Sequence, residues 1–274
     1  MTSSKCFAFS VANLRFHRVS EKNKSMTDAT NDNNTRLTLW NRVLATSVKM
    51  PFVKVDRDEF LNKELSKFCT PLEVMTSINE SPLNVLTKKE IDKLANQCIS
   101  YHLTMVSGTS ALMGIPGGWW MAGTIPTDLA QFYGHILSML QKLLYLYGWP
   151  ALTDAKNQLD DESLNILTLF VGVAMGNKLA VEAIGKVVTQ VSKTASLKIS
   201  ETVMAKYAIK IAQWIGINMT KEGFAKGVGK VIPLVGAPIS ATITYYTFRP
   251  RARRLKKHLD ELYEMRHFPI KRIE

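Results

Sequence analysis

Between Tyr101 and Pro150 the chain carries only two charged side chains, those of Asp128 and Lys142. Glycine and proline interrupt this apolar stretch, so it cannot form one continuous membrane-spanning helix, which needs about 20 apolar residues in a row. It is also too apolar for an exposed surface, because apolar area is driven out of water. The stretch must therefore be buried in a helical core, in a membrane, or in each at different times.

The distribution of positive charge indicates a negatively charged partner. The formal net charge is +12, and six bases follow an uncharged run over 231–248. These bases are Arg249, Arg251, Arg253, Arg254, Lys256 and Lys257. An apolar segment followed by a basic cluster is typical of a chain that enters a membrane from its cytoplasmic side. Nucleic acid is disfavoured as the partner, because its binding surfaces more often mix bases with polar and aromatic residues. A solvated basic last helix is the structural alternative.

Helix start signals and apolar spacing predict an all-α fold without a sheet. Thr70 with Glu73 and Thr87 with Glu90 have the pattern of capping boxes, and the second opens a helix with one buried face. Further helices are predicted to start near 57, 127, 161, 203 and 220, and the last helix to end near 265. The helix that starts near 161 is expected to continue past Gly176 to about 188. We expect one helical domain over about 50–270, in which Gly/Pro-broken apolar segments form helical hairpins.

Residues 1–45 are predicted to be a disordered N-terminal extension, because much of this segment is rich in Ser, Thr, Asn and Asp. Met26 is the expected start of translation. Three cysteines, Cys6, Cys69 and Cys98, have neither zinc-site nor disulfide spacing, which favours a reducing compartment.

Asp128, His135 and His102 are the only candidates for catalysis. Asp128 and His135 are seven residues apart and would share a helix face about 10 Å from each other, and His102 on the preceding helix could join them. Such a group can act as a general base or bind a metal. The structural alternative is an N-terminal helix aspartate beside two core histidines. The sequence has no catalytic, nucleotide-binding or metal-ligand motif, so we predict no metal and no cofactor and favour a non-enzymatic role.

Aromatic residues mark both ends of the apolar hairpin. Trp119 and Trp120 precede it, and Tyr145, Tyr147 and Trp149 close it. In a membrane such rings lie at the level of the lipid headgroups, whereas in a soluble protein they anchor the core. We predict that Trp119 and Trp120 bind lipid together with the six bases. Glycines such as Gly172 and Gly176 are expected to let helices pack closely.

Three segments resemble the signature of the bacterial EcsC family: ALMGIPGG at 111–118, TIPTDLAQF at 124–132 and QKLLYLYGWP at 141–150. The segment KVIPLVGAPISATITY at 230–245 is similar to the family's C-terminal block. The resemblance covers roughly 55–259 and implies a helical, membrane-associated protein whose family has no established activity. The positions that match the family pattern are Gly114, Pro116, Gly117, Gly118, Pro126, Asp128, Gly148, Pro233 and Gly236.

Together these patterns predict an amphitropic bacterial protein on the cytoplasmic face of the membrane. Its expected partners are anionic lipid, an integral membrane protein, or both, and the resemblance implies an ABC transporter as one such protein. A hydrolase-like enzyme that uses Asp128 and His135 in an apolar pocket is one alternative. A membrane-active toxin or immunity-type protein is another.

Overall fold

The computed structural model describes residues 37, 39–113, 127–154, 156–194, 201–219 and 238–267. These residues form helices and no strand, with one isolated bridge between Thr153 and Leu159, so the all-α prediction is confirmed. After a helix over 39–47, the elements are α2 (Arg57–Leu65), α3 (Pro71–Asn79), the short 3-10 helix η1 (Pro82–Asn84), α4 (Lys88–Met113), α5 (Thr127–Leu146), α6 (Asp161–Met175), α7 (Lys178–Thr194), α8 (Glu201–Met219) and α10 (Pro238–His267).

The predicted start signals are the ones that the helices use. Asp56 accepts a hydrogen bond from the Glu59 amide at the start of α2. Thr70 and Glu73 form a complete capping box at α3, with Pro71 at the first helical position. These contacts satisfy backbone N–H groups that have no partner inside a helix.

The helix predicted from 161 to about 188 is in fact two helices, α6 and α7. Gly176 ends α6 in the left-handed conformation, with φ +88°, which glycine adopts without steric cost. The side chain of Asn177 then accepts a hydrogen bond from the Ala180 amide and starts α7. Gly172 has the predicted packing role, because a Cβ there would lie 2.6 Å from Ile211 Cγ2 on α8.

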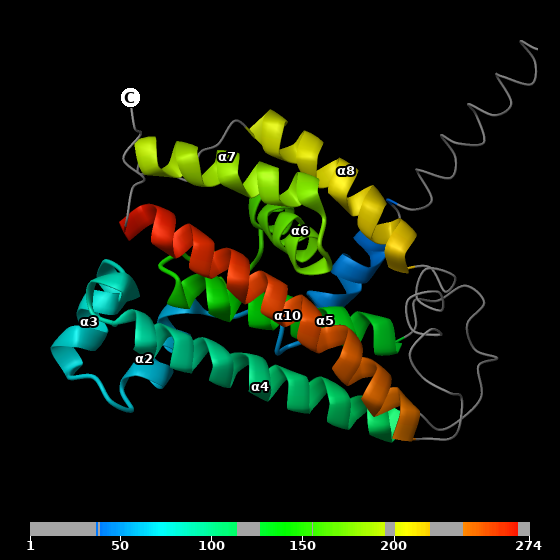
Figure 1. Cartoon of the computed structure of the whole chain (residues 1–274), viewed down its shortest axis with the longest axis horizontal. Coiled ribbons are helices and arrows are strands. Elements are labelled where there is room, and N and C mark those ends of the chain that lie inside the picture. Colours follow the sequence, from blue (N-terminus) through cyan, green and yellow to red (C-terminus); the bar gives the residue numbers. More distant parts are fainter. Residues whose placement is uncertain are drawn as a thin grey trace, which may run out of the picture.

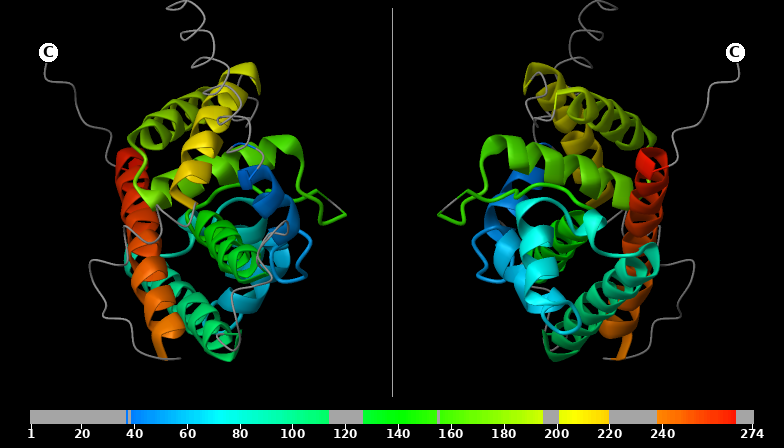
Figure 2. Two further views of the ribbon diagram at one scale, coloured as in Figure 1. Left: turned by 90° about the vertical axis from the view of Figure 1, so that its right-hand side faces the viewer. Right: turned by 90° about the vertical axis from the view of Figure 1, so that its left-hand side faces the viewer.

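α5 and α6 form the centre of the fold (Figures 1 and 2). α7 and α8 pack on α6, while α4 and α10 pack on each other and on α5. Nearly all of α5 from Ala130 to Leu146 is buried, as expected for a helix that is apolar on all sides. The part of the apolar middle that forms α5 therefore lies in a helical core, whereas Tyr101 and Met105 on α4 are exposed.

The domain begins earlier than predicted. The helix over 39–47 belongs to the core, since Trp40, Val43 and Leu44 are buried. The Trp40 indole donates a hydrogen bond to Thr168 Oγ1 on α6 at 3.1 Å and packs edge-on against Tyr133 on α5. Residues 39–45 are thus a structural part of the domain and not of an extension.

The aromatic residues that close the apolar stretch are core anchors. Tyr145, Tyr147 and Trp149 are each at most 3% exposed. The Tyr145 hydroxyl donates to the Val55 carbonyl and accepts from the Leu152 amide, so its polar end is satisfied inside the protein. Of the two alternatives for these three rings, lipid headgroups or a protein core, the structure shows the core.

Candidate functional site

The structure brings His102 and His135 into direct contact in the core. His102 lies on α4 and His135 on α5, and their Nδ1 atoms are 3.2 Å apart. Both side chains are buried, and Phe52 stacks on the His135 ring with 4.6 Å between the ring centroids. The apolar spacing of α4 puts His102 on the face that packs against α5, which is why two residues 33 positions apart meet.

Lys142 extends this pair to a chain of three basic groups. Lys142 was not among the site residues predicted from the sequence. Its Nζ atom lies 3.1 Å from His102 Nε2 and 5.3 Å from the centre of the Tyr101 ring. Lys142 is seven residues after His135 on α5, so the two lie on one helix face and His102 bridges them. The available signal was the single lysine within a long apolar helix.

Burial keeps both imidazoles neutral at pH 7. Burial is the main cause that lowers the pKa of His102 to about 2, and the nearby Lys142 adds to the effect. The same two causes lower the pKa of His135 to about 4. Burial also lowers the pKa of Lys142. Each shift reflects the cost of placing a cation away from water.

The direction of the hydrogen bonds along the chain is set by the tautomers of the two histidines. A neutral imidazole has one donor and one acceptor nitrogen. If Lys142 donates to His102 Nε2, the His102 proton is on Nδ1, and it points at His135 Nδ1. His135 then carries its own proton on Nε2. The arrangement can conduct a proton between Lys142 and His135, because every link has a donor and an acceptor.

Of the predicted Asp128–His135 pair, the structure describes the side chain of His135 but only the backbone of Asp128. Asp128 lies in the first turn of α5, as expected, but its side chain is outside the described part of the structure. The helix rise puts it about 10 Å along the axis from His135 and about 21 Å from Lys142. Within the described residues no three His, Cys, Asp or Glu side chains form a group that could hold a metal.

The six bases of α10 point to different sides of the helix, because successive residues are rotated around its axis. Arg251 turns inward and lies 5.7 Å from the Phe132 ring centre, and burial lowers the pKa of its guanidinium. Lys256 also turns inward, with a side chain only 15% exposed. Arg249 is half-buried over the Tyr245 ring. Of the six bases only Arg253, Arg254 and Lys257 are exposed, and we call these three the outer bases.

Lys256 belongs to an ion cluster that joins α4 to α10. Its ammonium contacts Asp92 and lies 2.9 Å from Asp260, while Lys88 lies 2.6 Å from Asp92 and 2.8 Å from Asp260. The Tyr147 hydroxyl donates a further hydrogen bond to Asp260. Burial alone would raise the pKa of Asp260, but hydrogen bonds from Lys88, Tyr147 and Lys256 outweigh it and lower that pKa. We call Lys88, Asp92, Lys256 and Asp260 the α4–α10 ion cluster.

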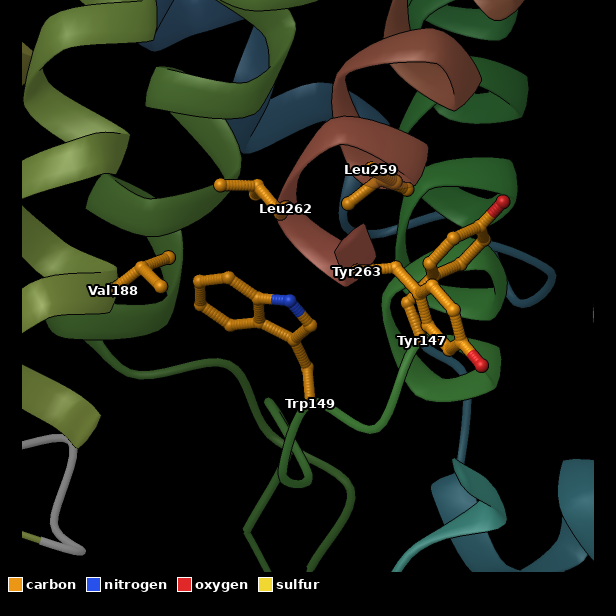
Figure 3. A pocket seen from close by; sticks show the side chains of 6 residues that line it. All are labelled: Tyr147, Trp149, Val188, Leu259, Leu262 and Tyr263. Atoms are coloured by element: carbon orange, nitrogen blue, oxygen red, sulfur yellow. The ribbon is translucent and has the colours of Figure 1, made fainter. Parts of the chain in front are cut away.

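A small apolar hollow lies beside this cluster (Figure 3). It is lined by Tyr147, Trp149, Val188, Leu259, Leu262 and Tyr263. The Trp149 indole points into the space between α7 and α10 (Figure 3). The Tyr147 hydroxyl at its edge is hydrogen-bonded to Asp260.

Most of the family positions, and both predicted lipid-binding tryptophans, fall outside the described residues. These are Gly114, Pro116, Gly117, Gly118, Trp119, Trp120, Pro126, Pro233 and Gly236. Gly148 is described, and its role is structural. It has φ +75°, and a Cβ there would lie 2.7 Å from Ser81 Oγ.

The described part of the chain has two long gaps, at 114–126 and 220–237. Met113 and Thr127 flank 114–126, and Met219 and Pro238 flank 220–237. The corresponding ends of α4, α5, α8 and α10 all lie on the right-hand side of Figure 1.

The sequence matches no model of a known family, and comparisons with curated proteins and with solved structures find no match either. None of the helices formed by the described residues is both long and apolar enough to cross a membrane.

Proposed function

We propose that this chain is a peripheral protein of the cytoplasmic membrane face that binds anionic lipid through the outer bases of α10. The supporting observation is that Arg253 and Arg254 are exposed and that neither is in an ion pair among the described residues, while the Arg254 guanidinium lies beside Gly176 at the end of α6. Lys257 has only a long contact with Glu261, at 3.7 Å. Each free cation close to an anionic bilayer contributes about 1 kcal/mol of binding free energy.

The outer face of α10 has the composition of a surface that lies flat on lipid. Tyr246 is 59% exposed, and Pro250, Arg253 and Lys257 follow on the same helix face at intervals of three or four residues. An aromatic ring beside arginines suits the headgroup region, where part of the surroundings is apolar and part is wet.

The proposed role agrees with the resemblance to the EcsC family, whose members are expected to be helical and associated with membranes. We propose membership of that family on the motif residues alone. An integral membrane protein, such as an ABC transporter, is a second binding partner in this proposal.

Flotation with lipid vesicles tests the proposal. The full-length protein is mixed with neutral phosphatidylcholine vesicles, or with vesicles that also contain phosphatidylglycerol, at low and high salt. We expect binding only to the anionic vesicles and weaker binding at high salt, because salt screens exposed charges. Replacing the three outer bases by glutamine removes about 3 kcal/mol of binding free energy. The affinity for anionic vesicles should therefore fall about a hundredfold at low salt.

A matched control separates this surface from net charge. Lys63, Lys93 and Lys178 are exposed lysines on α2, α4 and α7. Their triple glutamine variant loses the same charge and should bind nearly as well as the unchanged protein. Equal losses in the two triple variants, or binding that ignores lipid charge, would contradict the proposal.

A further inference from the structure

Lys142, which is half-buried, has an unusual hydrogen-bond partner for a lysine that is partly removed from water. Buried lysines are ordinarily paired with a carboxylate. The Lys142 ammonium instead lies 3.1 Å from the Nε2 atom of His102, a neutral base, and it forms no ion pair within the described residues. His102 in turn contacts His135, so the Lys142 ammonium is hydrogen-bonded to a neutral base, and Glu64 on α2 acts on it without an ion pair.

The groups around Lys142 do little to hold its proton. Cys98 on α4 is close, but burial raises the pKa of its thiol to about 12, so it is neutral at pH 7. From α2, Glu64 favours the ammonium and Lys63 opposes it. The Tyr101 ring contributes a cation–π contact at 5.3 Å. Burial is the largest influence, and it lowers the pKa of Lys142.

The histidine chain provides a route for the proton to leave. The Lys142 ammonium gives a proton to His102 Nε2, and His102 gives its Nδ1 proton to His135 Nδ1. The Nε2 proton of His135, a side chain that is 5% exposed, leaves at the far end of the chain. One proton leaves in total, and both imidazoles end neutral in the other tautomer. The hydrogen bonds then run in the opposite direction, and the free amine of Lys142 accepts from His102.

We propose that Lys142 is a nucleophilic amine that forms an imine with aldehydes or ketones, with His102 as the acceptor of its proton. The Nζ lone pair attacks the carbonyl carbon, and the C=O π pair moves to oxygen, which takes a proton to give a carbinolamine. The hydroxyl group then leaves as water with the remaining N–H proton, and a C=N bond forms. The carbonyl compound and the amine thus give one imine and one water. Tyr101, 55% exposed, offers an aromatic face beside the amine and favours an aromatic carbonyl compound.

Reductive labelling of the full-length protein tests this. The protein is treated at pH 7 with 4-nitrobenzaldehyde and cyanoborohydride, which makes the imine permanent, and each lysine is quantified by peptide mass spectrometry. Lys93, an exposed lysine on the same helix as His102, is the internal reference. We expect Lys142 to be labelled about tenfold faster than Lys93 although it is less exposed, because a desolvated lysine is an activated nucleophile.

The variant His102→Gln isolates the contribution of the imidazole. The glutamine oxygen accepts from the ammonium and stabilises it, but it cannot carry a proton onward. The ratio of Lys142 to Lys93 labelling should fall several-fold, with Lys93 labelling and the circular dichroism spectrum unchanged. If the variant does not fold, the pH profile of the unchanged protein decides: Lys142 labelling should level off at a lower pH than Lys93 labelling.

Two results would overturn the inference. One is labelling of Lys142 that is no faster than that of Lys93 at pH 7. The other is a folded His102→Gln protein with an unchanged labelling ratio. Neither result bears on lipid binding by α10, which the flotation experiment measures separately.

Discussion

Lys256 on α10 donates a hydrogen bond to Asp92 on α4, across 164 positions of sequence. This contact takes one of the six clustered bases away from the surface and uses it inside the fold. A base that faces a carboxylate inside the protein does not face a lipid. The six bases of α10 therefore differ in role: Lys256 stabilises the contact with α4, and the outer bases are available to bind a partner.

Lys256→Met should destabilise the fold by about 1–2 kcal/mol, because Asp92 and Asp260 each lose a charged hydrogen-bond partner in a partly buried site. Lys257→Met is the matched control, since the neighbouring Lys257 side chain is 81% exposed, and it should change the stability by less than about 0.5 kcal/mol. Urea denaturation followed by circular dichroism measures both. Similar losses in the two variants would mean that the α4–α10 ion cluster does not stabilise the fold.

The same cluster should make the fold sensitive to acid. Hydrogen bonds from lysines outweigh burial and lower the pKa values of Asp92 and Asp260 below the ordinary value of 3.8. The folded state then binds fewer protons than the unfolded chain, so this stabilisation is complete above about pH 4 and is lost as the pH falls through the lowered pKa values. Unfolding measured from pH 5 to pH 2 should show a steeper loss in the unchanged protein than in Asp260→Asn. Parallel curves would contradict this account.

The histidine pair should act in a higher pH window. The pKa of His102 is about 2 and that of His135 about 4 when folded, against 6.5 in the unfolded chain. Their contribution is therefore complete above about pH 6.5 and is lost as the pH falls below it, because only the unfolded chain takes up the protons. Between pH 6 and pH 4, each histidine should make the free energy of unfolding fall by roughly 1 kcal/mol for each pH unit of acidification. In His135→Gln the free energy of unfolding should depend less on pH between pH 6 and pH 4. An unchanged protein without this pH dependence would mean that the two histidines are exposed and not buried.

Two helical glycines should respond oppositely to alanine. At Gly172 an added Cβ would lie 2.6 Å from Ile211 and 2.9 Å from Ala180, whereas at Gly108 on α4 it would meet nothing within 4 Å. Gly172→Ala should lower the free energy of unfolding by about 1–3 kcal/mol, because α6 must move away from α7 and α8. Gly108→Ala should be neutral or stabilise the fold by up to about 1 kcal/mol, as alanine favours the helix. Thermal unfolding of both variants measures the difference, which should vanish if α6 and α8 are not closely packed.

Local chemistry made the helix starts predictable. Asp56, Thr70 and Thr87 are followed three residues later by glutamate, and the contact between cap and glutamate is complete within one turn. The break at Gly176 was missed because a glycine in an apolar run suits both close packing and a helix end. Asn177, a good cap directly after that glycine, was the signal for the second outcome.

The site depended on packing that no short segment contains. His102 and His135 were recognised as candidates, but their 3.2 Å contact depends on how α4 is placed against α5. Lys142 joined them for the same reason. The six bases of α10 looked equivalent in sequence, and the helix period distributed them around the axis.

The sequence by itself determined that this protein is helical, where most of its helices begin, and that its apolar middle must be buried, because capping, helix periodicity and the avoidance of water act over a few residues at a time. Only the tertiary structure decided that Tyr145 and Trp149 anchor a core, that Lys256 is internal while Arg253 is exposed, and that Lys142 adjoins two histidines. These facts depend on the relative placement of helices far apart in the chain, which is set by packing the whole core at once.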